Sequence, residues 1–181
     1  TIKPGWPQDW DYAKLETPDI KIDFSRKGKA DFYSIVSHFP EDVTFVLKLR
    51  ARSDQVKSLM LNGEPVQFKI NEEAIGSPEI MIETREASAF DISVEWAGKS
   101  VADPEILPVY AIGDHIKLPA GEFTVMGYKD PQRLLREIDK SKDGVSLKIG
   151  GEKGWRTLFV RLKQGDMLWW QPLTFELRNP V

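Results

Sequence analysis

Residues 163–178 read KQGDMLWWQPLTFELR, a short turn followed by a stretch in which apolar and polar residues alternate. Neighbouring residues of a β-strand point to opposite faces of the sheet. Trp169 shares its phase with Leu173 and Phe175, whereas Trp170 shares its phase with polar residues. We therefore expect Trp169 to lie in a hydrophobic core and the ring of Trp170 to be exposed.

The same period-two alternation recurs through the chain and predicts an all-β fold. It is clearest at residues 43–50 and 90–96. Between these stretches, Asn62-Gly63 supplies the positive φ angles that a tight hairpin turn requires. Roughly seven strands precede Gly98 and roughly five follow it, which predicts two tandem immunoglobulin-like antiparallel β-sandwich units.

The alternation stops at residues 99–104, where Pro104 ends a stretch that is typical of a connector. We therefore predict a β-sandwich domain at residues 1–100, with an N-terminal segment anchored by tryptophans, and a smaller β-sandwich-like domain at residues 101–181. A helix competes at one place only, residues 131–139. There Asp130 offers a cap and proline occupies a tolerated first-turn position, so we predict one short helical segment.

The composition excludes several classes of function. The 181 residues have a formal net charge of -3, with both signs interspersed, so neither nucleic acid nor a membrane is an expected partner. Cysteine is absent, which excludes disulfides and thiolate metal sites, and the two histidines, His38 and His115, lie far apart. No metal site, cofactor or catalytic residue is predicted. The start at Thr1 favours a fragment or a processed product.

Exposed aromatic rings are the best functional lead in the sequence. Indole faces stack on the apolar faces of pyranose rings while nearby polar side chains bond the hydroxyl groups. Such a site is predicted at Trp170 and Trp155, with Gln171, Arg156 and Asp166 as polar neighbours. The alternative is that these rings cover another domain or the other half of this chain.

Two sets of motifs carry a family resemblance. The second half contains YKDPQ at 128–132, TLFV at 157–160 and QGDMLWWQP at 164–172, and the first half contains LNGEPV at 61–66 and FDISVEW at 90–96. These stretches resemble the C-terminal β-sandwich regions of glycosidase-like proteins from polysaccharide-degrading bacteria. In that family, the catalytic part looks like a six-hairpin α/α toroid, which has no counterpart in this sequence.

The resemblance implies a non-catalytic accessory domain of a secreted or periplasmic bacterial carbohydrate-active protein. Its implied partners are an adjacent catalytic domain of a longer parent chain, against which it would pack, and polysaccharide. The parent could be a glycoside hydrolase, but no catalytic residue can be assigned to this chain. An immunoglobulin-like protein-interaction or adhesion module, unrelated to sugars, fits the composition equally well.

Overall fold

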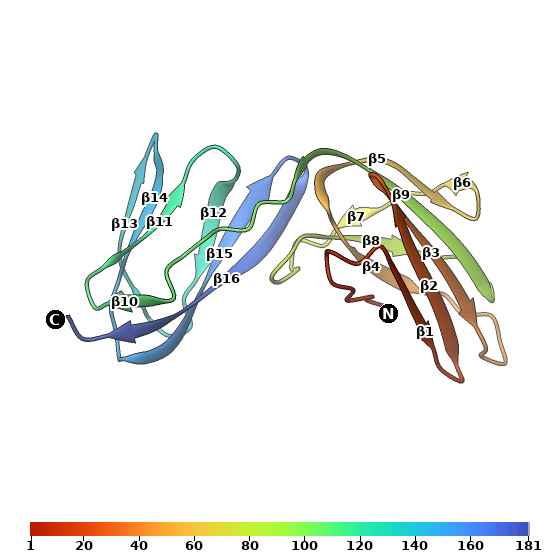
Figure 1. Cartoon of the computed structure of the whole chain (residues 1–181), viewed down its shortest axis with the longest axis horizontal. Helices are drawn as coiled ribbons and strands as arrows, with labels where there is room; N and C mark the ends of the chain where they lie inside the picture. The colour runs from red at the N-terminus through yellow and green to blue at the C-terminus, as the bar shows by residue number, and fades with distance from the viewer. Residues whose placement is uncertain (181) are drawn as a thin grey trace. The chain divides into compact units, whose positions relative to one another are not determined.

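The all-β prediction is confirmed by a computed structural model, which describes residues 1–180 (Figure 1). Every regular element among these residues is a strand. All but one of the strand pairs within the sheets are antiparallel. No helix long and apolar enough to cross a membrane occurs in the described part of the chain.

The chain divides into two compact units. The first consists of Thr1–Asn71 and Pro78–Val101, and the second consists of Glu72–Ser77 together with the chain from Ala102 onwards. The segment Glu72–Ser77, which we call the strap, therefore comes from the first half of the sequence but packs as part of the second unit.

The first unit is built from two sheets. A six-stranded sheet has the order β1-β2-β3-β9-β5-β6, and a three-stranded sheet has the order β4-β8-β7. The buried ring of Phe45 meets that of Phe90 at 5.2 Å between centroids, edge to face, in the core. The strands of this unit are β1 (Tyr12–Glu16), β2 (Ile20–Lys27), β3 (Ala30–Ser37), β4 (Val46–Arg50), β5 (Ser53–Leu61), β6 (Glu64–Pro65), β7 (Lys69–Ile70), β8 (Glu79–Glu83) and β9 (Ala89–Ser100).

The hairpin predicted at Asn62-Gly63 is confirmed. These two residues have φ angles of 52° and 81° and join β5 to β6. Two successive positive φ angles give a turn whose twist matches that of the flanking strands.

The second unit also has two sheets, with the orders β10-β16-β15-β12 and β11-β14-β13. The long β15–β16 hairpin pairs eleven residues on each side, from Gly154 with Leu177 to Gln164 with Met167. β10 joins β16 in the parallel direction. The strands are β10 (Val109–Ala111), β11 (His115–Pro119), β12 (Thr124–Lys129), β13 (Leu135–Ser141), β14 (Gly144–Ile149), β15 (Gly154–Gln164) and β16 (Met167–Arg178).

The helical segment predicted at residues 131–139 is wrong, because most of it forms β13. The Asp130 carboxylate does cap backbone groups, accepting hydrogen bonds from the N–H groups of Leu134 and Leu135 at 2.8 Å each. It closes a turn rather than a helix, since Arg133 has a φ of 55°. The chain then pairs with β14.

Candidate functional site

The strap covers the indole that the sequence predicts to be exposed. Trp170 is only 7% exposed. Its backbone N–H donates to the carbonyl of Ala74 at 2.8 Å, and the N–H of Gly76 donates to the carbonyl of Trp170 at 2.8 Å. The strap thus lies beside β16 as a one-residue parallel bridge through Ile75. The expectation of an exposed Trp170 ring is wrong, because tertiary structure supplies a cover.

Charged side chains complete the cover over Trp170. The Lys129 ammonium lies 4.2 Å and the Arg161 guanidinium 5.5 Å from the indole centroid, both in cation–π geometry. The strap pairs with these cations, Glu73 with Lys129 at 3.2 Å and Glu72 with Arg161 at 3.0 Å. The surroundings of Trp170 are therefore those of a packed structural residue.

Trp155 is the predicted site residue that stays open, with 67% of its surface exposed. Trp170 pairs across the hairpin with Arg161, which lies six residues after Trp155 on β15. Trp155 and Trp170 therefore lie on the same face of the β15–β16 hairpin. At the rise of a strand this offset separates the two indoles by about 20 Å, so they cannot stack on one sugar ring. Arg156 points to the other face and donates to the carbonyls of Glu152 and Lys153 at 2.8 and 2.9 Å.

The other two predicted polar residues are also apart from Trp155. The Gln171 side chain accepts a hydrogen bond from the indole N–H of Trp169 at 3.1 Å, on the face opposite to Trp170. Asp166 is exposed in the turn between β15 and β16, at the far end of the hairpin from Trp155. The structure therefore does not gather the five predicted residues into one site.

A row of exposed side chains crosses the outer face of the six-stranded sheet in the first unit. Phe32 is 42% exposed, between the buried residues Asp31 and Tyr33, so its ring points away from the core. Its cross-strand partners point the same way. The resulting aromatic row is Tyr12 on β1, Ser25 on β2, Phe32 on β3, Ser93 on β9 and Met60 on β5.

Five adjacent strands give the aromatic row a length of about 19 Å between its ends. Tyr12, at one end, is 78% exposed. A second row, the polar row, runs beside it and consists of Lys14, Asp23, Ser34 and Asp91. At its end, Asn62 accepts a hydrogen bond from the backbone N–H of Asp91 at 2.7 Å and so fixes the strand there.

The members of the two rows on β2, β3, β9 and β5 line a shallow depression of about 460 Å³, and Tyr12 and Lys14 on β1 lie outside it. Its lining includes the outward-facing apolar side chains of Phe32 and Met60. Hydroxyl and carboxylate groups surround these two side chains. They come from Ser25, Ser34, Ser93, Asp23 and Asp91.

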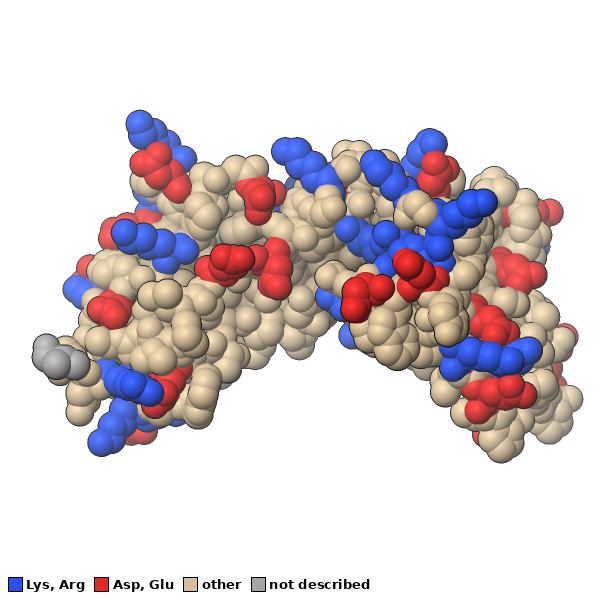
Figure 2. Space-filling view, in the orientation of Figure 1, with Lys and Arg blue, Asp and Glu red and all other residues tan. Residues whose placement is uncertain are grey.

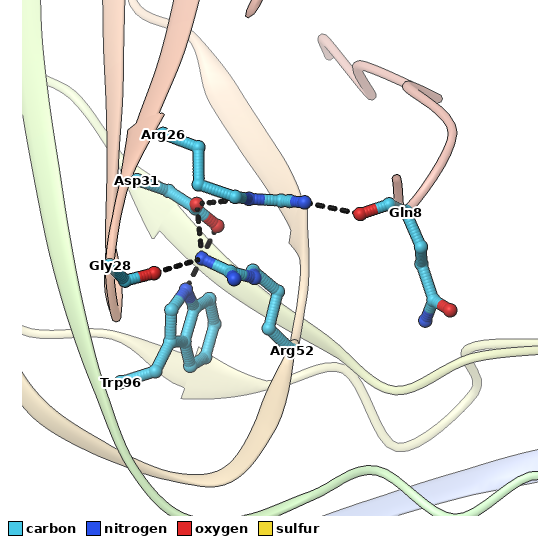
Figure 3. Close-up of polar contacts among 6 residues, drawn as sticks. All are labelled: Gln8, Arg26, Gly28, Asp31, Arg52 and Trp96. Carbon is cyan, nitrogen blue, oxygen red and sulfur yellow. Dashed lines mark hydrogen bonds and ion pairs between the residues drawn. The ribbon is translucent and has the colours of Figure 1, made fainter. Parts of the chain in front are cut away.

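A polar network centred on the buried Asp31, the chain neighbour of Phe32, lies on the other face of the sheet (Figure 3). The Asp31 carboxylate accepts hydrogen bonds from Arg26, Arg52 and the indole N–H of Trp96, each at 2.9 Å. These donors come from β2, from the turn before β5 and from β9, so one carboxylate ties together the strands around Phe32. Arg26 also donates to the backbone carbonyl of Gln8 and thereby fastens the N-terminal segment that leads into β1.

The network also affects its neighbour Tyr33. Burial raises the pKa of the Tyr33 phenol, and the nearby Asp31 carboxylate raises that pKa further. The hydroxyl is therefore kept protonated beneath the sheet. No group of three or more metal-ligating side chains occurs among residues 1–180.

The sequence contains a local signal for the exposure of Phe32. Phe32-Tyr33 is, like Trp169-Trp170, a pair of adjacent aromatic residues in a strand, so one ring must point to each face. At Phe32-Tyr33 the alternation leads to an exposed ring, because no segment within residues 1–180 covers Phe32 as the strap covers Trp170. Tyr12 and Met60 carry no such signal, since only the strand order brings them level with Phe32.

Charge does not mark a nucleic-acid surface on the face drawn in Figure 2, where acidic side chains lie next to the basic ones. Comparisons with protein-family models, with curated proteins and with solved structures find no match to this chain. The resemblance to accessory regions of glycosidase-like proteins therefore stays a prediction from the sequence motifs.

Proposed function

We propose that this chain is a non-catalytic module that holds neutral glycan chains on the outer face of its six-stranded sheet. The observation that carries the proposal is the aromatic row beside the polar row. Phe32 and Tyr12 offer ring faces to the apolar sides of pyranose rings. The serine hydroxyls donate to or accept from the sugar hydroxyl groups, and the aspartate carboxylates accept hydrogen bonds from them.

The charges of this face favour neutral sugars over acidic ones. Asp23 and Asp91 both line the depression, and no Lys or Arg lines it with them. Lys21 pairs with Asp23 at 3.5 Å, which leaves Asp91 without a cation among the described ion pairs. A uronic-acid polymer would meet a carboxylate, whereas a neutral sugar hydroxyl can donate to it.

The proposal includes the parent protein and the location that the resemblance implies: an exported, carbohydrate-active bacterial protein with a catalytic domain next to this chain. The exposed ring of Trp155 is a second, separate contact for glycan. Trp170, which is buried under the strap, has a structural role and does not contact glycan. The alternative, a protein-interaction module, is favoured by a different feature: in the described chain β7 is only two residues long and leaves the end of β8 at Glu83 without a neighbouring strand on that side.

A pull-down with insoluble and soluble neutral polysaccharides tests the proposal, with pectate and alginate as acidic comparisons. Phe32→Ala should lower retention of the bound neutral polymer at least tenfold and Tyr12→Ala should lower it less, because Tyr12 lies at the end of the row. Phe39→Ala is the matched control, since Phe39 is 43% exposed but lies in a loop outside the sheet.

Three results would contradict the proposal. The first is that no neutral polysaccharide retains the intact chain. The second is that Phe32→Ala and Phe39→Ala have equal effects on retention. The third is that pectate or alginate is retained in preference to the neutral polymers.

A further inference from the structure

One edge of β8 in the first unit is open along part of its length. β8 lies between β4 and β7, but β7 consists of Lys69–Ile70 alone. The chain that precedes β7, residues 66–68, has left the sheet. Within the described chain, no strand therefore continues β7 beside Glu83.

The hydrogen-bond pattern shows which backbone groups of β8 face this opening. On the β4 side, the N–H of Thr84 donates to the carbonyl of Phe45 at 2.9 Å. On the β7 side, the N–H of Asn71 donates to the carbonyl of Glu79 at 2.8 Å. Bonded pairs alternate along an antiparallel strand, so even-numbered residues bond to β4 and odd-numbered residues face β7. The backbone N–H and carbonyl of Glu83 thus face the opening.

A groove lies along this edge. Its volume is about 640 Å³, and a second depression of about 300 Å³ adjoins it, sharing Pro65, Val66 and Arg85. Both apolar and charged residues line the groove. Its apolar lining includes Val46, Val66, Phe68, Met81 and Ile82, and its charged lining is Lys69, Glu83 and Arg85.

We propose that the open edge of β8 binds an extended segment of a partner protein, which adds as a strand antiparallel to β8. Strand addition satisfies the free backbone groups of the edge and leaves side-chain pockets to select the sequence. This inference concerns a surface separate from the aromatic row and goes beyond the proposed glycan function.

Charge complementarity defines the partner segment. The alternation of burial continues past the end of β8, with Ile82 and Thr84 buried and Glu83 and Arg85 exposed, so the last two side chains point to the same face. Neither Glu83 nor Arg85 has an ion pair among the described residues. Opposite charges favour each other across neighbouring strands. A segment running antiparallel to β8 therefore reads acidic residue, apolar residue, basic residue. Its apolar member lies opposite Thr84 and points toward Val66 and Ile82.

Two synthetic peptides test the proposal on the intact chain. The complementary peptide is acetyl-Thr-Thr-Glu-Val-Lys-Val-Thr-amide, and in the control peptide the Glu and Lys are exchanged. Titration calorimetry should give the complementary peptide an affinity about tenfold higher than the control. The double substitution Glu83→Lys with Arg85→Glu should reverse this preference and leave the chain folded, since both side chains are exposed.

The variant Glu83→Pro tests the backbone contact. It deletes the N–H that faces the opening, while the bonds to β4 come from the even-numbered residues, and proline is tolerated where an edge N–H faces solvent. Binding of the complementary peptide should fall at least tenfold, with an unchanged circular dichroism spectrum. Retention of neutral polysaccharide through Phe32 should be unchanged, so a failure of either proposal can be told from a failure of the other.

Three results would overturn this inference. Equal affinity for the two peptides would show that Glu83 and Arg85 do not select the segment by charge. Unchanged binding by a folded Glu83→Pro variant would show that the segment does not pair with the backbone N–H of Glu83. Concentration-dependent dimerisation of the intact chain that Glu83→Pro abolishes would show that a second copy, and not a partner protein, occupies the edge.

Discussion

Replacing Trp170 with alanine should destabilise the second unit strongly and leave glycan retention unchanged. The side chain is 7% exposed under the strap. A buried tryptophan removes about 150–250 Å² from water, worth about 4–6 kcal/mol at about 25 cal/mol per Å². Mutations of this kind cost about 3–5 kcal/mol in practice. We expect a loss of about 4 kcal/mol in the free energy of unfolding, including the cation–π contacts of Lys129 and Arg161.

Residue-resolved hydrogen exchange is the suitable assay for this loss. A chain with two compact units need not unfold in one step, so a single global transition would mix the two. Exchange of the β15–β16 amides reports the second unit alone. These amides should lose protection in the Trp170→Ala variant, while those of β3 and β9 in the first unit serve as the internal reference.

Trp155→Ala is the matched control for Trp170→Ala. Its indole is exposed, so the change should alter the free energy of unfolding by no more than about 0.5 kcal/mol. Trp170→Phe should keep part of the burial and lose about 1–2 kcal/mol. The reasoning is refuted by a loss below about 1 kcal/mol in Trp170→Ala, or by reduced glycan retention in that variant at a temperature where it is folded.

Three further predictions concern the buried network and one turn. Asp31→Ala leaves the partly buried Arg26 and Arg52 without their shared carboxylate. The free energy of unfolding, measured by urea denaturation, should fall by about 3–5 kcal/mol. Because the pKa of Tyr33 is raised in the folded state, the folded chain holds this proton more tightly than the unfolded chain. Stability should therefore be level below about pH 9 and fall above about pH 10, and Tyr33→Phe should flatten the fall. Gly144→Ala should cost at least about 2 kcal/mol in thermal unfolding, since Gly144 has a φ of 130° and an added Cβ would collide with the carbonyl of Leu118; an unchanged melting temperature would contradict it.

Local patterns predict a strand well where they also determine which strand it pairs with. Asn62-Gly63 allows a two-residue turn with positive φ angles, and such a turn pairs its flanking residues directly. The pattern at residues 131–139 was ambiguous, because the same apolar spacing suits a helical face or a strand. Pairing with β14, the next strand along the chain and joined to this segment by the turn at Lys142-Asp143, decided for the strand.

At the candidate site, too, the local pattern predicts some features and leaves others to the tertiary structure. Alternation predicts the direction of a side chain: Trp169 and Trp170 point to opposite faces of one strand, and Phe32 and Tyr33 to opposite faces of another. It cannot predict whether something lies in that direction. The level row of Tyr12, Phe32 and Met60 depends on the strand order, which local alternation does not contain.

By itself, then, the sequence determined that this chain forms strands and toward which face of each strand a residue points, because both follow from the two-residue period of an extended backbone. Only the tertiary structure decided what each outward residue meets. Trp170 meets the strap, which comes from about ninety positions earlier in the chain, whereas Phe32 meets solvent. Contacts at such separation arise from the pairing of whole sheets, and no local spacing of residues encodes them.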